Sequence, residues 1–281
     1  MPIIHYVAPS VWAWRPGRAR QMAGFLDHLL ALLPFEAPYF EDAGLPCTFV
    51  GHPVVESGAD QGNGTVFRER YGIEAEGPLI AVLPGSRGSE VRHLLPEFEA
   101  TLDRLAAQRP RLHAVVATVA TVREEVEAAA RRWSVPTTVV HEEQAKFDAF
   151  AASDVALAAS GTVALELAMA QTPAIIAYKM NPITSWLARR IVNVKYVHIA
   201  NLVLDREVVP EYLLDRCRSD LLVPAIEELL DDEVKAKAQI DGTTVALSSL
   251  GLGGPPPSAR AAEAVLRVVV DRSWKAERRQ L

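Results

Sequence analysis

The sequence predicts an α/β protein whose parallel sheets are covered by helices on both faces. Three observations lead to this fold class. Short apolar or β-branched runs alternate along the chain with stretches of helical periodicity. The runs are almost continuously apolar, which is typical of strands that are buried on both faces. Prolines stand at the joins, where helices begin or end, namely Pro34, Pro110, Pro136, Pro173 and Pro182.

The first expected segment, residues 1–57, is short for a domain. Strands are predicted over 3–7, 28–33 and 47–51, and helices over 17–25 and 35–43. Such a half-sheet buries too little apolar surface to be stable alone, so we expect it to pack as an appendage or to belong to a larger domain. The polar, glycine-rich stretch HPVVESGADQGNGT marks a boundary near 52–64.

Residues 58–250 are predicted to form a complete domain. Six apolar runs are interpreted as strands, at 79–83, 113–119, 137–140, 155–159, 174–178 and 196–200. Helices are predicted between them, at 90–108, 121–133, 144–152, 162–171 and 182–192. Ligands of open parallel sheets bind outside the carboxyl ends of the strands, so the loops after these runs are the candidate functional segments.

Residues 251–281 are predicted to form a loop and a terminal helix. The stretch LGLGGPPPSAR is a stiff loop, and apolar residues recur at helical spacing over 258–275. We expect this last helix to pack back toward the N-terminal domain.

Composition excludes several classes of protein. The 281 residues are 49% hydrophobic and 23% charged, as in ordinary globular proteins, and the formal charge of −6 argues against nucleic acid as the main partner. Two cysteines indicate no disulfide framework, and no apolar run reaches the roughly 18 residues that span a bilayer. The N-terminus lacks the order of a signal peptide. We expect a cytoplasmic protein that is soluble or at most peripheral on a membrane.

A glycine turn follows the strand at 79–83. The sequence LIAVLPGSRGSEVRHLLP places Gly85 and Arg87 between a buried strand and a helix. Backbone N–H groups at a helix N-terminus suit an anion, and Arg87 could add a bidentate contact to phosphate. The turn is neither a Walker loop nor a GxGxxG motif. A tight turn with a surface arginine is the alternative interpretation.

A second glycine turn follows the strand at 155–159. Ser160 or Thr162 could cap the next helix, Gly161 opens its N-terminus, and Glu166 lies one turn further, where a carboxylate could accept ribose hydroxyls. Simple capping with a solvated Glu166 is the alternative. Two such strand ends in one domain favour a nucleoside diphosphate as the ligand.

Other polar or aromatic residues have two interpretations each. Asn201 follows the run at 196–200 and could bind sugar hydroxyls or simply form a turn. Trp12 and Trp14 could meet a ligand or lipid, or pack internally. His52 could face a cleft or be a satisfied turn residue. The basic runs RPGRARQ and LARR could contact anionic lipid or be solvated.

Together these residues resemble the lipid-A-disaccharide synthases, a family of sugar-nucleotide transferases of the GT-B type. The resemblance extends from about residue 5 to about residue 215. Its matching stretches are YVAPSVWAWRPGRARQM, LLPFEAPYF, CTFVGHPVVE, LPGSRGSEV, ASDVALAASGTVALELAMAQTPAIIAYKMNPITSWLARRIV and YVHIANLVLDREVVPEYL.

The resemblance implies a fold of two Rossmann-like domains. It implies transfer of 2,3-diacylglucosamine from UDP to 2,3-diacylglucosamine 1-phosphate, which gives a β-1,6-linked disaccharide and UDP, with no metal and no organic cofactor. By the same resemblance Gly85, Ser86 and Arg87 form the diphosphate loop. Ser160, Gly161, Thr162 and Glu166 form the second nucleotide motif, and Asn201 points at the donor. Arg87 and Asn201 are the expected catalytic residues, since charge develops on the leaving UDP.

The chain also departs from the family pattern. The family opens with further strands and helices that carry a glycine-rich motif and a candidate base aspartate, and neither is found here. We therefore expect residues 1–57 to be the C-terminal remnant of a first Rossmann-like domain, and catalysis by this chain alone to be weak. The alternatives are a non-catalytic UDP-sugar-binding fragment and another GT-B protein such as a UDP-N-acetylglucosamine 2-epimerase. Peripheral contact with the inner membrane and a homodimer stay open.

Overall fold

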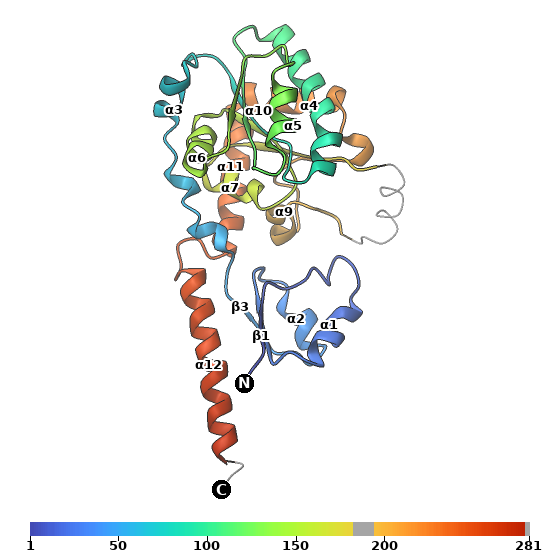
Figure 1. Cartoon of the computed structure of the whole chain (residues 1–281), viewed down its shortest axis with the longest axis vertical. Coiled ribbons are helices and arrows are strands. Elements are labelled where there is room, and N and C mark those ends of the chain that lie inside the picture. The colour runs from blue at the N-terminus through green and yellow to red at the C-terminus, as the bar shows by residue number, and fades with distance from the viewer. Residues whose placement is uncertain (182–193, 279–281) are drawn as a thin grey trace. The chain divides into compact units, whose positions relative to one another are not determined.

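The computed structural model describes residues 1–181 and 194–278, and its chain divides into two compact units (Figure 1). Of the described residues, 1–57, 194–195 and 246–278 belong to the first unit, and 58–181 and 196–245 belong to the second. The helix expected at 182–192 lies outside the described residues. The chain leaves the second unit at residue 246, inside a continuous helix, and not in the loop expected after residue 250.

The first unit contains a three-stranded parallel sheet in the order β1-β2-β3. Its elements are β1 (Ile4–Tyr6), α1 (Gly17–Ala23), β2 (His28–Ala31), α2 (Ala37–Glu41), β3 (Cys47–Phe49) and the 3-10 turn η1 (Pro53–Glu56). Leu29, Phe40 and Leu45 lie at the centre of one small core on this sheet.

The terminal helix α12 (Pro257–Arg278) packs on the first unit's sheet. Ala264 forms a second small core with Leu30 and Val50. The guanidinium of Arg260 donates to the carbonyl oxygen of Phe49 at 2.8 Å. The core of this unit therefore combines residues from both ends of the chain.

The second unit is built on a six-stranded, fully parallel sheet in the order β6-β5-β4-β7-β8-β9. Its strands are β4 (Leu79–Leu83), β5 (His113–Ala117), β6 (Thr137–Val140), β7 (Val155–Ala159), β8 (Ala174–Tyr178) and β9 (Glu211–Leu213). Every residue of β4 and β7 is buried, so both faces of the sheet are covered at its centre. The strand order reverses between β4 and β7, which defines a switch point.

Helices connect and cover these strands (Figure 1). They are α3 (Gly64–Tyr71), α4 (Gly88–Gln108), α5 (Arg123–Ala130), α6 (Glu143–Ala152), α7 (Val163–Met169), α9 (Ile199–Leu204), α10 (Ser219–Asp231) and α11 (Glu233–Ser249), with 3-10 turns η2 (Ala59–Gln61) and η3 (Leu214–Arg216). The main core gathers apolar side chains of β4, β5, β7 and β8 with those of α4, α5 and α10.

The prediction of a strand at 196–200 is wrong. These residues lead into α9, whose first turn is capped by His198, because its ring Nδ1 accepts from the backbone N–H of Ala200 at 3.2 Å. The sixth strand of the sheet is instead β9, which pairs with β8.

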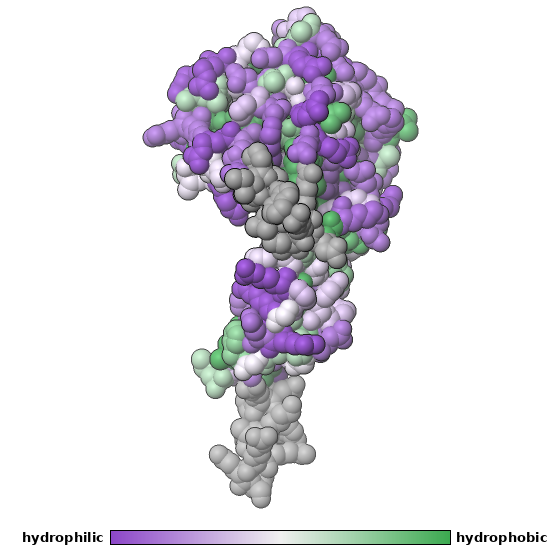
Figure 2. All heavy atoms as spheres, turned by 90° about the vertical axis from the view of Figure 1, so that its right-hand side faces the viewer, coloured by the Kyte–Doolittle hydropathy of each residue, from purple (hydrophilic) through white to green (hydrophobic). Residues whose placement is uncertain are grey.

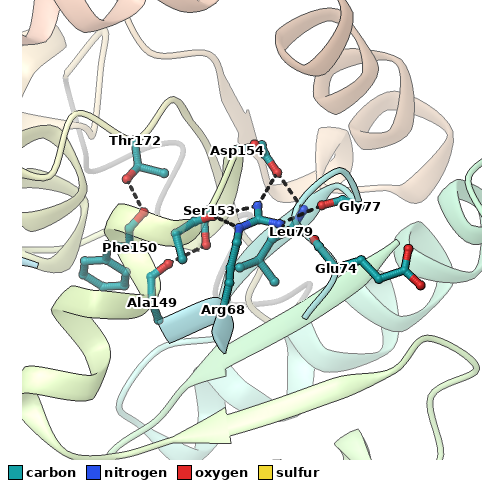
Figure 3. Close-up of polar contacts among 10 residues, drawn as sticks. Arg68, Glu74, Gly77, Leu79, Ala149, Phe150, Ser153, Asp154 and Thr172 are labelled. Atoms are coloured by element: carbon teal, nitrogen blue, oxygen red, sulfur yellow. Dashed lines mark hydrogen bonds and ion pairs between the residues drawn. The ribbon is translucent and has the colours of Figure 1, made fainter. Parts of the chain in front are cut away.

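Arg68 on α3 joins three segments of the second unit (Figure 3). Its guanidinium donates to the carbonyl oxygens of Ala152, Glu74 and Gly77 at 2.8 to 3.1 Å. It also contacts Asp154 at 3.0 Å, and the same Asp154 oxygen accepts from the backbone N–H of Leu79 at 2.8 Å. The network fixes α3 against the starts of β4 and β7, which are the two strands that flank the switch point.

Candidate functional site

A pocket of about 380 Å³ lies in the second unit at the carboxyl ends of β4, β5 and β7. This is the position at which open parallel sheets bind their ligands, since strand order reverses between β4 and β7. Its lining comprises Leu83, Gly85, Ser86, Arg87, Glu90, Ala117, Thr118, Val119, Lys146, Ala159, Ser160, Gly161, Thr162, Val163 and Glu166.

The turn after β4 forms one wall of the pocket. Gly85 has a φ of 100°, a backbone conformation that residues other than glycine rarely adopt. The residue before α4, Arg87, makes no side-chain cap, and the first N–H groups of this long helix keep their capacity for an anion.

Arg87 and Glu90 form an ion pair on this wall. The Nη1 of Arg87 lies 2.6 Å from Oε1 of Glu90, whose hydrogen bond and charge raise the pKa of Arg87. The arginine side chain is 76% exposed and the glutamate side chain 10% exposed. Glu90 therefore anchors one end of Arg87, while most of the guanidinium stays accessible from the pocket.

The turn after β7 forms the opposite wall. Gly161 has a φ of 154°, and Thr162 precedes α7 without a side-chain cap. Glu166, in the first turn of α7, has its Oε2 atom 2.8 Å from the Nζ of Lys146 on α6. Both side chains are mostly buried, at 16% and 23% exposure.

The structure brings the residues of the two expected glycine turns together in this single pocket. Gly85, Ser86 and Arg87 line it from one side, and Ser160, Gly161, Thr162 and Glu166 line it from the other. The topology explains this result, because parallel strands that are neighbours in a sheet present their carboxyl ends side by side.

Asn201 is not among the residues that line this pocket. The residue is fully buried in α9. Its amide oxygen accepts from the backbone N–H groups of Val208 and Val209 at 2.7 and 2.9 Å, and its amide nitrogen donates to the carbonyl of Val209 and to Glu211. These contacts use its amide within its own loop, so in this conformation it organises residues 208–211.

Three pocket residues are not evident from the sequence. Glu90 could have been inferred from its position three residues after Arg87 on a helix, since such pairs face each other. Lys146 and Thr118 give no comparable signal, because they come from α6 and from the end of β5. The hydroxyl of Thr118 is buried without a hydrogen-bond partner among the described residues.

Two candidate residues of the first unit, His52 and Trp12, make internal contacts, whereas Trp14 is exposed. His52 caps η1, accepting from the backbone N–H of Val54 at 3.2 Å, and burial lowers the pKa of its ring to about 4. The indole of Trp12 donates to Glu36 at 3.2 Å and meets the ring of Phe35 edge to face. Trp14 is 41% exposed and lies under the guanidinium of Arg15.

The described part of the chain has neither a cluster of metal-ligating side chains nor a membrane-spanning helix. Residues 1–181 and 194–278 contain no cluster of His, Cys, Asp or Glu that could hold a metal ion. Within the same residues, no helix is long and apolar enough to cross a bilayer. Figure 2 shows one face of the molecule, on which hydrophilic residues prevail over the second unit.

The fold is the GT-B fold, as solved structures confirm. Anabaena Alr3699/HepE in complex with UDP-glucose aligns with a TM-score of 0.55 and 13% identity, over 95% of this chain and 72% of that chain. The UDP-GlcNAc 2-epimerase from Neisseria meningitidis bound to UDP-GlcNAc aligns with a TM-score of 0.63 and 12% identity, over 95% of this chain and 70% of that chain. WaaG, a glycosyltransferase involved in lipopolysaccharide biosynthesis, aligns with a TM-score of 0.53 and 15% identity, over 83% of this chain and 61% of that chain. The fold and pocket thus define a protein of the GT-B class.

The chain belongs to the lipid-A-disaccharide synthetase family, whose model matches residues 1–255. The lipid-A-disaccharide synthase of Rhodospirillum centenum is 58% identical over 272 residues, which are 97% of this chain and 68% of that protein. The enzyme of Paramagnetospirillum magneticum is 50% identical over 268 residues, 95% of this chain and 68% of that protein. Membership of this family makes the chain a glycosyltransferase of lipid A biosynthesis by descent, and it spans about two thirds of the length of these relatives.

Proposed function

We propose that the pocket binds the UDP part of UDP-2,3-diacylglucosamine, and that this sugar is transferred to 2,3-diacylglucosamine 1-phosphate. The observation that carries the proposal is the meeting of two glycine turns, those of Gly85 and Gly161, at one switch point, with Arg87 and Glu166 on facing walls. A pocket of this size, lined by both apolar and polar side chains, suits one nucleotide.

The diphosphate is assigned to the wall after β4. The uncapped first turn of α4 offers backbone N–H groups, and the accessible guanidinium of Arg87 offers a charge-assisted contact. The ribose is assigned to Glu166, whose carboxylate can accept hydroxyl hydrogens.

In the proposed transfer, a hydroxyl oxygen of the acceptor sugar forms a bond to the anomeric carbon of the donor. The bond from that carbon to the diphosphate oxygen breaks, and its electrons leave with UDP, while the hydroxyl proton passes to a base. The role of Arg87 is to stabilise the charge that grows on the leaving diphosphate, which is where preorganised donors lower a barrier most.

UDP should bind this chain and raise its melting temperature. A ligand that binds only the folded state stabilises by mass action, by about 2.7 kcal/mol at a hundredfold excess over Kd. Calorimetric titration and thermal unfolding with UDP check this. An absence of binding heat and of any thermal shift at millimolar UDP would contradict the proposed donor site. Because the chain spans 68% of the length of the two relatives described above, binding is the direct test of this pocket.

Two substitutions should show which part of the ligand each side of the pocket binds. Arg87→Ala should weaken UDP roughly tenfold to a hundredfold, since a charge-assisted hydrogen bond contributes about 1.5–3 kcal/mol, and should leave uridine almost unaffected. Glu166→Ala should weaken both ligands, because both contain ribose. Arg104→Ala, which removes an exposed charge further along α4, is the matched control and should leave both affinities unchanged. If Arg87→Ala lowered the affinities for UDP and for uridine equally, Arg87 would not bind the diphosphate.

A further inference from the structure

Lys146 is a pocket residue to which the proposed transfer gives no role. It projects from α6 toward α7, where its Nζ donates to Oε2 of Glu166 at 2.8 Å. Its ammonium also lies 4.6 Å from the centre of the Phe147 ring, which limits the rotamers of its long side chain. Both contacts keep the charged end of Lys146 at the pocket lining.

The contact leaves the two oxygens of Glu166 unequal. Oε2 is engaged by the ammonium, whereas Oε1 has no hydrogen-bond partner among the described residues. A carboxylate at the edge of a pocket can otherwise turn about its side-chain bonds, since a glutamate has several rotamers to lose. The ammonium fixes this orientation, and it does so in a setting that is mostly shielded from water.

We propose that Lys146 is a positioning residue that makes the pocket selective for ribose over deoxyribose in a nucleoside diphosphate. The inference rests on the proposed function, in which Glu166 binds the ribose. Lys146 holds one carboxylate oxygen so that the other meets a ribose hydroxyl at a fixed place. A hydroxyl that pairs with an oriented carboxylate contributes more than one that pairs with a mobile carboxylate, because less freedom is lost on binding.

A purely electrostatic role is the alternative for Lys146. Four charged side chains line the pocket among the described residues, and they form two ion pairs, Arg87 with Glu90 and Lys146 with Glu166. Loss of Lys146 would leave net negative charge facing a diphosphate. That repulsion acts alike on ribose and deoxyribose ligands, so the ratio of their affinities separates it from positioning.

The experiment measures calorimetric affinities of UDP, 2′-deoxy-UDP and 3′-deoxy-UDP for the whole chain and its variants. The unsubstituted chain should bind at least one deoxy ligand about tenfold more weakly than UDP, as expected for the loss of one charge-assisted hydrogen bond. In Lys146→Met that ratio should fall to about threefold or less. Lys146→Arg, which keeps a cation, should restore a large part of it.

A double-mutant cycle gives the second readout. Glu166→Gln keeps the shape of the side chain but loses the ion pair, and it should lower the same ratio. Adding Lys146→Met to Glu166→Gln should then change the ratio little, since the lysine acts through the carboxylate. Lys146→Gln replaces Lys146→Met if thermal unfolding without ligand shows that the Met variant is not folded.

The outcomes separate this inference from the function on which it rests. No binding of UDP by the unsubstituted chain would overturn the donor site itself. Binding of UDP with equal affinities for the deoxy ligands, or a ratio unchanged in Lys146→Met, would overturn the positioning role and leave the donor site standing. A structural role alone would lower the melting temperature of Lys146→Met without moving the ratio.

Discussion

Arg68→Ala is expected to lower the free energy of unfolding of the second unit by about 3 kcal/mol. The guanidinium, 15% exposed, satisfies the carbonyl oxygens of Ala152, Glu74 and Gly77 at once. Alanine removes this donor from the partly buried carbonyl oxygens of Ala152 and Gly77, and unpaired buried groups are the costly part of a lost hydrogen bond. The starts of β4 and β7 should therefore loosen together.

Hydrogen exchange of peptides from β4 and β7 measures this effect within the second unit alone. Asp154→Asn is the control, since it removes the charge next to Arg68 but keeps an oxygen for the backbone N–H of Leu79. Asp154 is 48% exposed, so this change should cost about 1 kcal/mol or less. If both variants lose the same stability, the ion pair and not the three carbonyl contacts would account for the role of Arg68.

Acid is expected to destabilise the second unit through His198. Burial lowers the pKa of this ring to about 4 in the folded chain, against 6.5 for a free histidine. Between these values the unfolded chain binds a proton that the folded chain does not, so stability falls as the pH falls from about 6.5 to 4. The full loss is about 3 kcal/mol at 1.36 kcal/mol for each pH unit. Nearby, Glu211 is bound to the backbone N–H of His198 at 2.9 Å.

His198→Asn tests this expectation. Asparagine keeps an acceptor for the backbone N–H of Ala200 at the start of α9 but does not ionise. Urea unfolding of the variant should therefore lose less stability between pH 6.5 and 4.5 than that of the unsubstituted chain. His141→Asn, at an exposed position, serves as control and should keep the steeper loss. Identical pH profiles for His198→Asn and the unsubstituted chain would exclude His198 as the titrating group.

The sequence predicts five strands of the second unit, β6 at one edge of the sheet included, but it misses β9 at the other edge. β4, β7 and β8 are buried on both faces, which makes their apolar runs continuous. β9 has only three residues, and Glu211 among them binds backbone N–H groups of the segment before α9. Apolar runs of four to six residues do not distinguish a strand from the approach to a helix, so the strand expected at 196–200 was misplaced.

Some residues of the predicted site could be grouped from the sequence, and others could not. Turn residues such as Gly85 and Gly161 could be grouped from the sequence, because topology alone brings the ends of neighbouring strands together. Lys146 could not, since its approach to Glu166 depends on how α6 and α7 pack. The donor role of Asn201 stays a prediction, and the sequence alone does not distinguish an amide that organises its own loop from one that binds a ligand.

The core of the first unit contains residues that the ribosome makes at very different times. Leu30 and Val50 leave the ribosome before the second unit, whereas Ala264, which completes their core, leaves it after that unit. At about 5–20 residues per second, the ribosome needs about 10–40 s to make the intervening segment. The second unit can fold during this time, whereas the core on the sheet of β1, β2 and β3 stays incomplete until α12 has been made. In the cell, chaperones would therefore meet β1, β2 and β3 without their complete core for longer than they would meet the strands of the second unit.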